Sequence, residues 1–257
     1  MANVEIPSLP ALLLAAGKGT RLEPLTLSVP KCLVPIAGRP LLDFWLSLCS
    51  GAGCTPIIVN THHLADQVRA HVETSSWADQ VLLRHEEALL GTGGTLLACR
   101  HLLEKGPFLV AHADNLSLFS LQDFWVAHRQ RPDGCLMTMM LFETPSPESC
   151  GIVDLDAAGR VRAFHEKVPN PPGRLANGAV YIMEPEVLDL LADCGRPQPD
   201  LSLDLVPLCL NRIAVFQNTV YHRDIGVPSS YALAQREFPA AVRACAPALR
   251  PKFWESE

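Results

Sequence analysis

Residues 10–31 constrain the fold more than any other part of this 257-residue chain. They begin with an apolar run at residues 11–16 in which hydrophobic and polar side chains do not alternate, as is typical of a strand covered on both faces. The run stops at residues 17–21, G-K-G-T-R. Two glycines after a buried strand let backbone N–H groups approach a phosphate chain closely, and Lys18 and Arg21 add positive charge. The segment therefore predicts a buried strand followed by a phosphate-binding turn.

Two better-known phosphate motifs do not fit these residues. A dinucleotide fingerprint needs a third glycine three residues after Gly19, where the chain has Leu22. A Walker A loop needs Ser or Thr after a Gly-Lys pair and a glycine five residues before that pair, but Gly19 and Leu12 occupy these places. The run that is present, G-K-G-T-R-L-E-P-L-T-L-S-V-P-K followed by V-P-I-A-G-R-P-L, resembles the sugar-1-phosphate nucleotidyltransferase family, also called nucleotide-sugar pyrophosphorylases.

The resemblance assigns roles to the first loop. It implies that Arg21 stabilises the leaving β- and γ-phosphates of a nucleoside triphosphate and that Lys31 reaches the region of the α-phosphate. The alternative for this segment is a surface turn whose lysine and arginine side chains have no role in ligand binding. The residues that the resemblance places on the nucleotide here are Ala15, Ala16, Gly17, Lys18, Gly19 and Thr20.

Strand and helix patterns alternate through the first half of the chain. Apolar runs at residues 56–60 and 81–85 predict strands, and helix patterns begin at Pro40 and cover residues 64–72. This rhythm predicts an α/β fold: a Rossmann-like, doubly wound, mostly parallel sheet in a three-layer α/β/α arrangement. We expect one nucleotidyltransferase domain over residues 1–238, with a nucleotide-binding half at about 10–134 and an acceptor-binding half at about 135–238.

Residues 86–95, E-E-A-L-L-G-T-G-G-T, form a second glycine-rich stretch. Closely spaced glycines are costly unless the backbone passes close to something flat or enters positive φ. In the resembled family this element lies against the nucleotide base and ribose, so Gly91, Thr92 and Gly93 are expected to bind the nucleotide. A plain flexible loop before a helix is the alternative.

A predicted strand at residues 107–111 leads into His112-Ala113-Asp114-Asn115. A carboxylate at the carboxyl end of a central strand is suited to hold a Mg²⁺ that bridges substrate phosphates. The resembled family usually has Gly-Asp where this chain has Ala113-Asp114, and Asp114 is expected to be a metal ligand. A structural Asx turn is the alternative for this residue.

From residue 150 onwards the pattern changes to strands without intervening helices, at residues 152–155, 161–165 and 176–183. These predict antiparallel additions to the sheet. The run 164–169 resembles the family's Phe-x-Glu-Lys-Pro element, which implies that Lys167 fixes the acceptor's phosphate and Glu166 accepts from sugar hydroxyls. Asn177, in a strand similar to the family's N-x-G-x-Y, and Gly151 are also expected at the acceptor. A surface ion pair and a turn asparagine are the alternatives.

A last strand is predicted at residues 214–222, before Asp224-Ile225-Gly226-Val227-Pro228. This run resembles the family's Asp-Ile-Gly-Thr-Pro, which implies that Asp224 is the second carboxylate on Mg²⁺; a helix-cap or turn residue is the alternative. Residues 239–257 have weak periodicity and predict a C-terminal tail with little order.

Composition excludes several classes of partner. The net charge is −6 and the 21 Lys and Arg are scattered, which argues against nucleic acid as a partner. No run approaches the roughly 18 to 20 apolar residues of a membrane span, and the first ten residues lack the pattern of a signal peptide. The nine cysteines form no C-x-x-C pair, as expected of reduced thiols in a cytoplasmic protein.

The resemblance implies an enzyme that uses Mg²⁺, a nucleoside triphosphate and a sugar-1-phosphate, and makes a nucleotide-sugar and pyrophosphate. The form of residues 90–94 is most similar to members that use GTP with mannose- or heptose-1-phosphate. A UTP or dTTP user, a cytidylyltransferase with a non-sugar phosphate acceptor, and a non-catalytic nucleotide-sugar-sensing subunit stay open as alternatives. So does a homo-oligomer.

Overall fold

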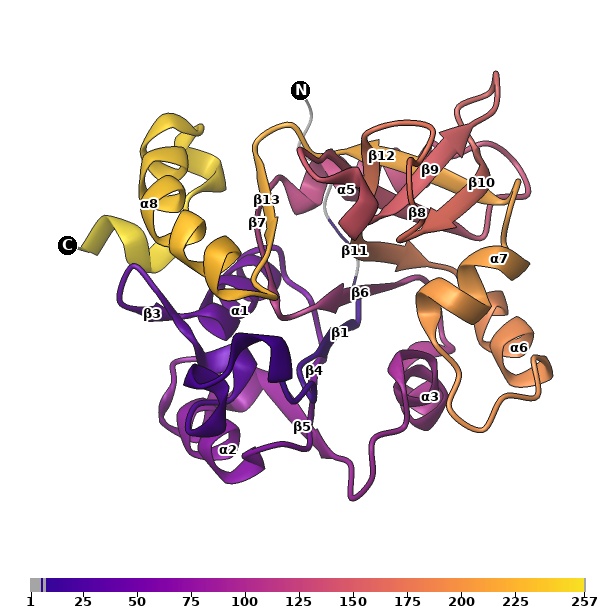
Figure 1. The fold of residues 1–257 in the computed structure, drawn as a ribbon. Helices are drawn as coiled ribbons and strands as arrows, with labels where there is room; N and C mark the ends of the chain where they lie inside the picture. Colours follow the sequence, from indigo (N-terminus) through magenta and orange to yellow (C-terminus); the bar gives the residue numbers. More distant parts are fainter. Residues whose placement is uncertain (1–5, 7, 257) are drawn as a thin grey trace. The chain divides into compact units, whose positions relative to one another are not determined.

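The computed structural model describes residue 6 and residues 8–256, and these divide into two compact units. Unit 2 contains residues 8–89, 111–121 and 220–256, and unit 1 contains residues 90–110 and 122–219. Strand β6 (Phe108–His112) carries the chain from unit 1 into unit 2 (Figure 1). That residues 10–134 bind the nucleotide and residues 135–238 bind the acceptor stays a prediction.

Unit 2 is built on three parallel strands, as the sequence pattern predicts. Strand β1 (Ala11–Leu14) pairs with β4 (Ile57–Thr61), which pairs with β5 (Val81–His85). Every residue of β1 and β4 is buried, which is why neither strand alternates in sequence. Helices α1 (Leu41–Gly51) and α2 (Ala65–Thr74) supply the crossovers, so parallel strands end at the same edge of the sheet.

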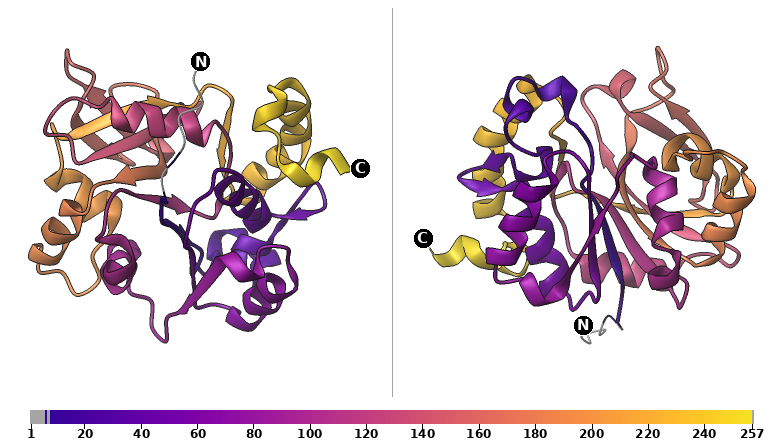
Figure 2. Two further views of the ribbon diagram at one scale, coloured as in Figure 1. Left: turned by 180° about the vertical axis from the view of Figure 1, so that it is seen from behind. Right: turned by 90° about the horizontal axis from the view of Figure 1, so that it is seen from below.

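Helix α8 (Pro228–Ala244) packs in unit 2 against apolar side chains of residues 22–44. Phe238 of α8 and Phe44 of α1 meet edge to face with ring centroids 4.9 Å apart. Figure 2 shows α8 and the C-terminal turns, in yellow, from two further sides beside the indigo and violet elements of unit 2. The 3-10 turns Pro247–Leu249 and Lys252–Ser256 follow, with Phe253 and Trp254 against the same core, so this segment has structure that the sequence pattern did not predict.

Three short strands of unit 2 complete the frame. β2 (Pro35–Ile36) and β3 (Arg39–Pro40) form a hairpin before α1, and β7 (Asn115–Leu118) pairs antiparallel with β13 (Tyr221–Asp224). The single strand predicted at residues 214–222 was wrong. The structure has β12 (Ile213–Gln217) in unit 1 and β13 in unit 2; the pairing with β8 ends at Gln217, and the chain passes into unit 2 after Thr219.

Unit 1 contains the predicted antiparallel strands. β11 (Leu175–Met183) pairs antiparallel with β8 (Met137–Glu143) and β9 (Gly151–Leu155), and β10 (Val161–Glu166) pairs with β9. β12 adds a parallel strand beside β8. The helices of this unit are α3 (Thr92–Ala98), α4 (Arg100–Leu103), α5 (Leu121–Arg129), α6 (Glu186–Asp193) and α7 (Val206–Leu208), with a π-helical turn at Leu201–Leu205.

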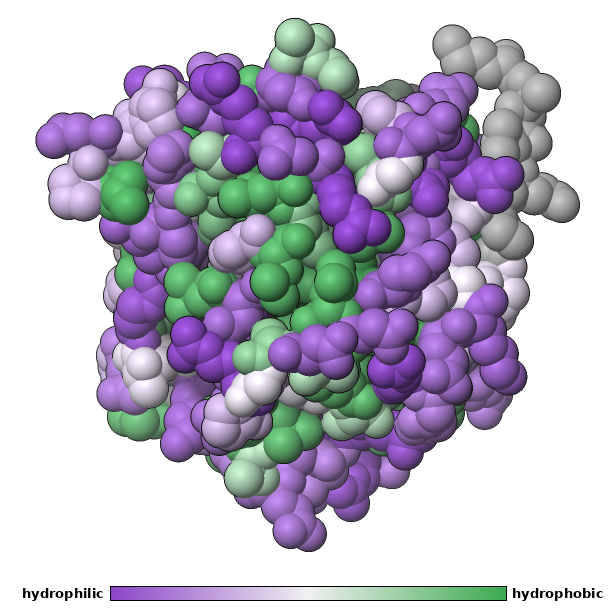
Figure 3. Space-filling view, turned by 90° about the vertical axis from the view of Figure 1, so that its right-hand side faces the viewer, coloured by the Kyte–Doolittle hydropathy of each residue, from purple (hydrophilic) through white to green (hydrophobic). Residues whose placement is uncertain are grey.

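Two leucines stand out on the surface of unit 1. Leu203, in the π-helical turn, is 64% exposed and Leu208, in α7, is 48% exposed. These elements lie at the right of Figure 1, the side that faces the viewer in Figure 3, where apolar side chains gather among polar ones.

Across the described residues we find no helix with the length and apolar character that crossing a bilayer requires.

The fully buried His128 of α5 predicts how the stability of the protein depends on pH. Burial, together with the charges of Arg131 and Arg129, lowers the pKa of His128 from 6.5 to about 3. Below pH 6.5 the unfolded chain therefore takes up a proton that the folded protein does not. His128 should therefore contribute a fall of about 1.4 kcal/mol in the free energy of unfolding for each pH unit between about 6.5 and 3, which chemical denaturation at a series of pH values would measure.

A matched pair of variants isolates this contribution. His128→Gln should reduce the slope of the free energy of unfolding against pH by about 1.4 kcal/mol per pH unit between pH 6 and 4, whereas His101→Gln, at an exposed position of α4, should leave the slope unchanged. His222 has a similarly lowered pKa because of burial, and it contributes equally in both variants. An unchanged slope in His128→Gln would contradict the assignment.

Candidate active site

The turn after β1 takes the form that its glycines predict. Gly19 has φ +67°, a conformation that favours glycine. A methyl group at Gly19 would lie 2.9 Å from Thr26 Cγ2 and 3.1 Å from Lys31 Cβ, so the turn packs tightly against the segment that carries Lys31. Thr26 Oγ1 donates a hydrogen bond to the Gly19 carbonyl at 2.8 Å. Gly19, Thr26 and Lys31 are thus parts of one packed loop.

Lys31 and two carboxylates form the electrostatic centre of unit 2. Lys31 Nζ lies 2.5 Å from Asp114 Oδ2 and 3.8 Å from Asp224 Oδ1. Asp114 follows β6, and Asp224 ends β13, which pairs with β7 in the register Asp224↔Asn115. The strand pairing therefore places the two aspartates side by side although they are 110 residues apart in sequence.

Burial differs among the three charged groups. The Lys31 side chain is 7% exposed, whereas Asp114 is 34% and Asp224 is 54% exposed. Burial by itself raises the pKa of Asp114, but the charges of Lys31 and His112 and the hydrogen bond from Lys31 outweigh it and hold the pKa below its usual value. Asp114 is therefore ionised at neutral pH, and a buried ammonium group bonds it directly.

Arg21 lies beside the same pair of strand ends. A methyl group at Gly226 would stand 2.6 Å from Asp224 Oδ2 and 3.1 Å from Arg21 Nη2, so both charged groups approach this glycine. Gly226 has an ordinary φ, and glycine is needed there for space and not for conformation. The predicted Arg21, Lys31, Asp114 and Asp224 are thus brought to one place within unit 2.

Some of the other residues of the first loop are exposed to solvent, and others are buried or hydrogen-bonded to the protein. Gly17, Lys18 and Thr20 are exposed, and Ala16 is buried. The Ala15 N–H donates to Asn60 Oδ1 at 2.6 Å, and Asn60 Nδ2 donates to Glu86 Oε1 at 2.9 Å.

Sequence reasoning missed Asn60 and Glu86, which hold the start of this loop. Both are buried, and both stand where a parallel strand ends: Asn60 in the last residues of β4 and Glu86 directly after β5. The signal was available, because a polar residue at the carboxyl end of an apolar parallel strand lies at the edge where ligands bind.

The second glycine-rich loop, in unit 1, is held by its own chain. A methyl group at Gly91 would lie 2.8 Å from the Pro199 carbonyl oxygen, and one at Gly93 would lie 2.9 Å from the same atom. The Gly93 N–H donates to that oxygen at 2.8 Å, and Thr92 Oγ1 donates to Asp200 Oδ2 at 2.9 Å. The flat neighbour inferred from the glycines is therefore the backbone at Pro199, and the assignment of this loop to the nucleotide stays a prediction.

The four predicted acceptor residues also lie in unit 1. Gly151 begins β9 opposite Glu166 of β10, and a methyl group at Gly151 would stand 2.6 Å from Glu166 Oε2. Lys167 has φ +49°, which is uncommon for a residue with a side chain, and its Nζ lies 3.0 Å from Glu166 Oε1. Asn177 is occupied locally: it accepts from the Ala179 N–H and donates to the Tyr181 hydroxyl.

A Rossmann-like α/β fold in which a polar turn, a lysine, an arginine and paired carboxylates meet where strands end is typical of enzymes whose substrates carry phosphate groups. The nucleotidyl transferase family model matches residues 10–240, and the chain belongs to this family. The family and the enzyme class predicted from the sequence, a nucleotidyltransferase, are therefore confirmed.

Sequence relatives carry guanylyl- and uridylyltransferase names. A mannose-1-phosphate guanylyltransferase of Mycobacterium tuberculosis is 32% identical over 246 residues, which are 93% of this chain and 67% of that protein. A mannose-1-phosphate guanylyltransferase catalytic subunit beta of Drosophila melanogaster is 33% identical over 183 residues, 70% of this chain and 49% of that protein. An N-acetylmuramate alpha-1-phosphate uridylyltransferase of Caulobacter vibrioides is 34% identical, with 77% and 81% covered.

Solved structures confirm the predicted fold. A putative glucose-1-phosphate thymidylyltransferase of Bacillus anthracis superposes with a TM-score of 0.81 at 17% identity, covering 93% of this chain and 96% of that one. A UDP-glucose pyrophosphorylase gives 0.76 at 20% identity, covering 90% and 98%. The chain spans only about half to two thirds of the guanylyltransferases that it matches.

Gly226 provides a test of the site's geometry. Gly226→Ala should push Asp224 or Arg21 from its place and lower kcat by about tenfold or more, with little change in the melting temperature, because the contact is at exposed charged groups. Gly106→Ala is the matched control, since Gly106 has no neighbour within 4 Å and an ordinary φ. Equal turnover of the two variants would contradict the site.

Proposed function

We propose that this chain transfers a nucleotidyl group from a nucleoside triphosphate to a sugar-1-phosphate, with release of pyrophosphate. The observation that carries the proposal is the buried Lys31 ammonium group between Asp114 and Asp224, beside Arg21 and the turn at residues 17–21. In the reaction an oxygen of the sugar phosphate forms a bond to the α-phosphorus while the bond between α-phosphorus and the bridging oxygen breaks. The leaving pyrophosphate takes the electron pair and needs cations nearby.

The residues of unit 2 suit the triphosphate. Lys31 is placed to neutralise charge at the α-phosphate, and Arg21, with Lys18 assisting, at the β- and γ-phosphates. Backbone N–H groups of residues 15–20 would bind phosphate oxygens without adding bulk. None of these groups forms a covalent intermediate, so the chain works by holding the two anionic substrates and stabilising charge.

The carboxylate pair fits a divalent metal. Asp114 and Asp224 both approach one cation, the Lys31 ammonium group, so their oxygens already face a common point of positive charge. Among the described residues no group of three or more His, Cys, Asp or Glu side chains could hold a metal unaided. Mg²⁺ suits such a place because it uses one or two carboxylates and completes its shell with phosphate oxygens and water. Bound there, Mg²⁺ would neutralise charge on the phosphates.

The acceptor is assigned to unit 1. Lys167 is the cation for the sugar's phosphate, Glu166 accepts hydrogen bonds from sugar hydroxyls, and Gly151 leaves room for the Glu166 side chain. The Glu166–Lys167 contact of 3.0 Å keeps the two groups together at the end of β10. Asn177 uses its oxygen and one N–H group internally, which leaves its second N–H group for a hydroxyl.

Two substrate pairs compete. GTP with mannose- or heptose-1-phosphate is supported by the form of residues 90–94 and by the guanylyltransferase relatives. UTP with an amino-sugar-1-phosphate is supported by the uridylyltransferase relative, of which this chain covers 81%. All nine cysteines are free thiols, which supports a reducing compartment, the cytoplasm, as the place of action.

Pyrophosphate release tests the proposal directly. We expect turnover with Mg²⁺ for one pair from a matrix of GTP, UTP, dTTP, CTP and ATP against mannose-, heptose-, glucose- and N-acetylmuramate-1-phosphate and phosphocholine. Asp114→Ala should abolish this turnover, and Asp66→Ala, at an exposed position of α2, should not. Nucleotide binding without any pyrophosphate release across the matrix would contradict the proposed transfer reaction and would favour a non-catalytic sensing subunit.

A further inference from the structure

One aspartate fixes the segment of unit 1 that follows α6. Asp200 caps the π-helical turn Leu201–Leu205, and its Oδ1 accepts from the Ser202 N–H at 2.8 Å and the Leu203 N–H at 3.0 Å. Asp204 Oδ2 accepts from the Asp200 N–H at 2.8 Å, so the two aspartates cap the turn reciprocally. Leu203 stays 64% exposed, so polar contacts and not the burial of this side chain hold the turn. Turns of this kind are rare and occur frequently at functional sites.

The second oxygen of Asp200 holds the glycine-rich loop of unit 1. Thr92 Oγ1 donates to Asp200 Oδ2 at 2.9 Å and accepts from the Leu201 N–H at 2.8 Å. A hydroxyl group has one proton, and here Asp200 accepts it, so Thr92 does not donate to a ligand. The Gly93 N–H bonds the Pro199 carbonyl beside Asp200. The loop assigned to the nucleotide is therefore held by a carboxylate that lies outside it.

The same turn reaches Asn177 through a buried tyrosine. Tyr181 is fully buried, and its hydroxyl bonds the Ser202 side chain and accepts from Asn177 Nδ2 at 2.6 Å. Burial raises the pKa of Tyr181, so the hydroxyl keeps its proton at neutral pH. Asn177 Oδ1 accepts from the Ala179 N–H at 2.9 Å. Because both ends of the amide are bonded, the direction of its second N–H group is fixed.

We propose that Asp200 is a positioning residue for both substrates of the transfer reaction. Through Thr92 it holds the loop assigned to the nucleotide. Through Ser202 and Tyr181 it fixes the Asn177 amide, which is assigned to the acceptor. This inference rests on the proposed function, which supplies the ligand at each end. All five residues belong to unit 1, and Asp200 acts through the others without binding either substrate itself.

Asp200→Asn tests the link to the nucleotide. The amide keeps an oxygen for the N–H groups of Ser202 and Leu203, but it places an NH₂ group, which cannot accept a hydrogen bond, opposite Thr92. GTP and UTP are each titrated by calorimetry in the presence of Mg²⁺. The Kd of the nucleotide should rise by about tenfold or more, the scale of a lost hydrogen bond to a charged group, and the KM of the sugar-1-phosphate should stay unchanged.

Tyr181→Phe and Asp200→Ala test the link to the acceptor. Tyr181→Phe keeps the ring but removes the hydroxyl that Asn177 bonds, so the KM of the sugar-1-phosphate should rise by about tenfold or more while the Kd of the nucleotide stays unchanged. Asp200→Ala removes both carboxylate oxygens and should raise both constants. A change that only lowers the stability of the protein would not divide its effects between the two substrates in this way.

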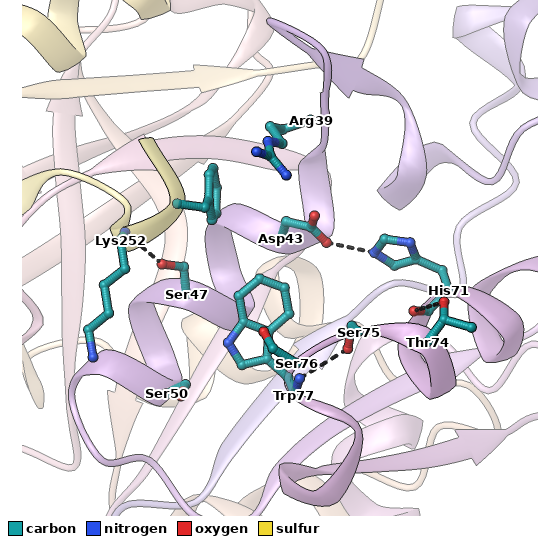
Figure 4. A pocket seen from close by; sticks show the side chains of 11 residues that line it. Arg39, Asp43, Ser47, Ser50, His71, Thr74, Ser75, Ser76, Trp77 and Lys252 are labelled. Carbon is teal, nitrogen blue, oxygen red and sulfur yellow. Dashed lines mark hydrogen bonds and ion pairs between the residues drawn. The ribbon is translucent and has the colours of Figure 1, made fainter. Parts of the chain in front are cut away.

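Two controls are matched to these changes. Asp204→Asn makes the same substitution on the same turn, where the amide oxygen can still accept from the Asp200 N–H. His71→Ala removes the 2.6 Å contact with Asp43 beside a cavity of unit 2 (Figure 4), which tests for a general effect of a lost side-chain hydrogen bond. Both controls should leave Kd and KM unchanged. If Asp200→Asn does not fold, Thr92→Val compared with Thr92→Ser, which keeps the hydroxyl, tests the same link.

The outcomes separate this inference from the proposed function, because nucleotide binding is measured without acceptor or turnover. Nucleotide binding without pyrophosphate release would contradict the proposed function and the acceptor link, and Asp200→Asn would still decide the nucleotide link. An unchanged Kd in Asp200→Asn would overturn the nucleotide link, and an unchanged KM in Tyr181→Phe would overturn the acceptor link. Binding of neither nucleotide by the unmodified protein, or equal losses in the two controls, would overturn both links.

Discussion

The ion pair between Lys31 and Asp114 organises the site in unit 2. A nearly buried ammonium group is costly unless it is bonded, and here one carboxylate lies 2.5 Å away and a second lies 3.8 Å away. Three parts of the fold position this cluster. The 3-10 turn Lys31–Leu33 carries Lys31, Asp114 follows the end of β6, and the pairing of β7 with β13 places Asp224. The charge cluster and the strand arrangement therefore depend on each other.

Glycine plays several different parts in this chain. At Gly19 the positive φ and the close contacts with Thr26 and Lys31 both require it, whereas at Gly226 space for Asp224 and Arg21 is the reason. At Gly91 and Gly93 the crowding atom belongs to Pro199, so these glycines let the loop bond to the chain itself. A glycine-rich stretch thus signals close approach, but the sequence does not say to what.

Local patterns predicted most of the fold and the four charged residues of the candidate site. The buried parallel strands of unit 2 and the antiparallel strands of unit 1 follow from their apolar patterns, and Arg21, Lys31, Asp114 and Asp224 were chosen because their segments resemble motifs of the family. Long-range pairing was not predictable: β13 binds β7 across about a hundred residues, and the C-terminal turns are ordered by packing of Phe253 on Phe44. The Ala15–Asn60–Glu86 network was missed because each member is unremarkable alone.

We propose that a divalent cation binds Asp114 and Asp224, so the Lys31 ammonium group competes with it for these two carboxylates. The most direct measurement is the affinity of the nucleotide-free protein for Mn²⁺. It is obtained by titrating the protein with Mn²⁺ and measuring the free ion by electron paramagnetic resonance. Lys31→Met leaves Asp114 and Asp224 without their cation, so this variant should bind Mn²⁺ about tenfold tighter or more than the unmodified protein, and Lys31→Met combined with Asp224→Asn should lose the gain. Equal or weaker binding by the folded Lys31→Met variant would contradict the account.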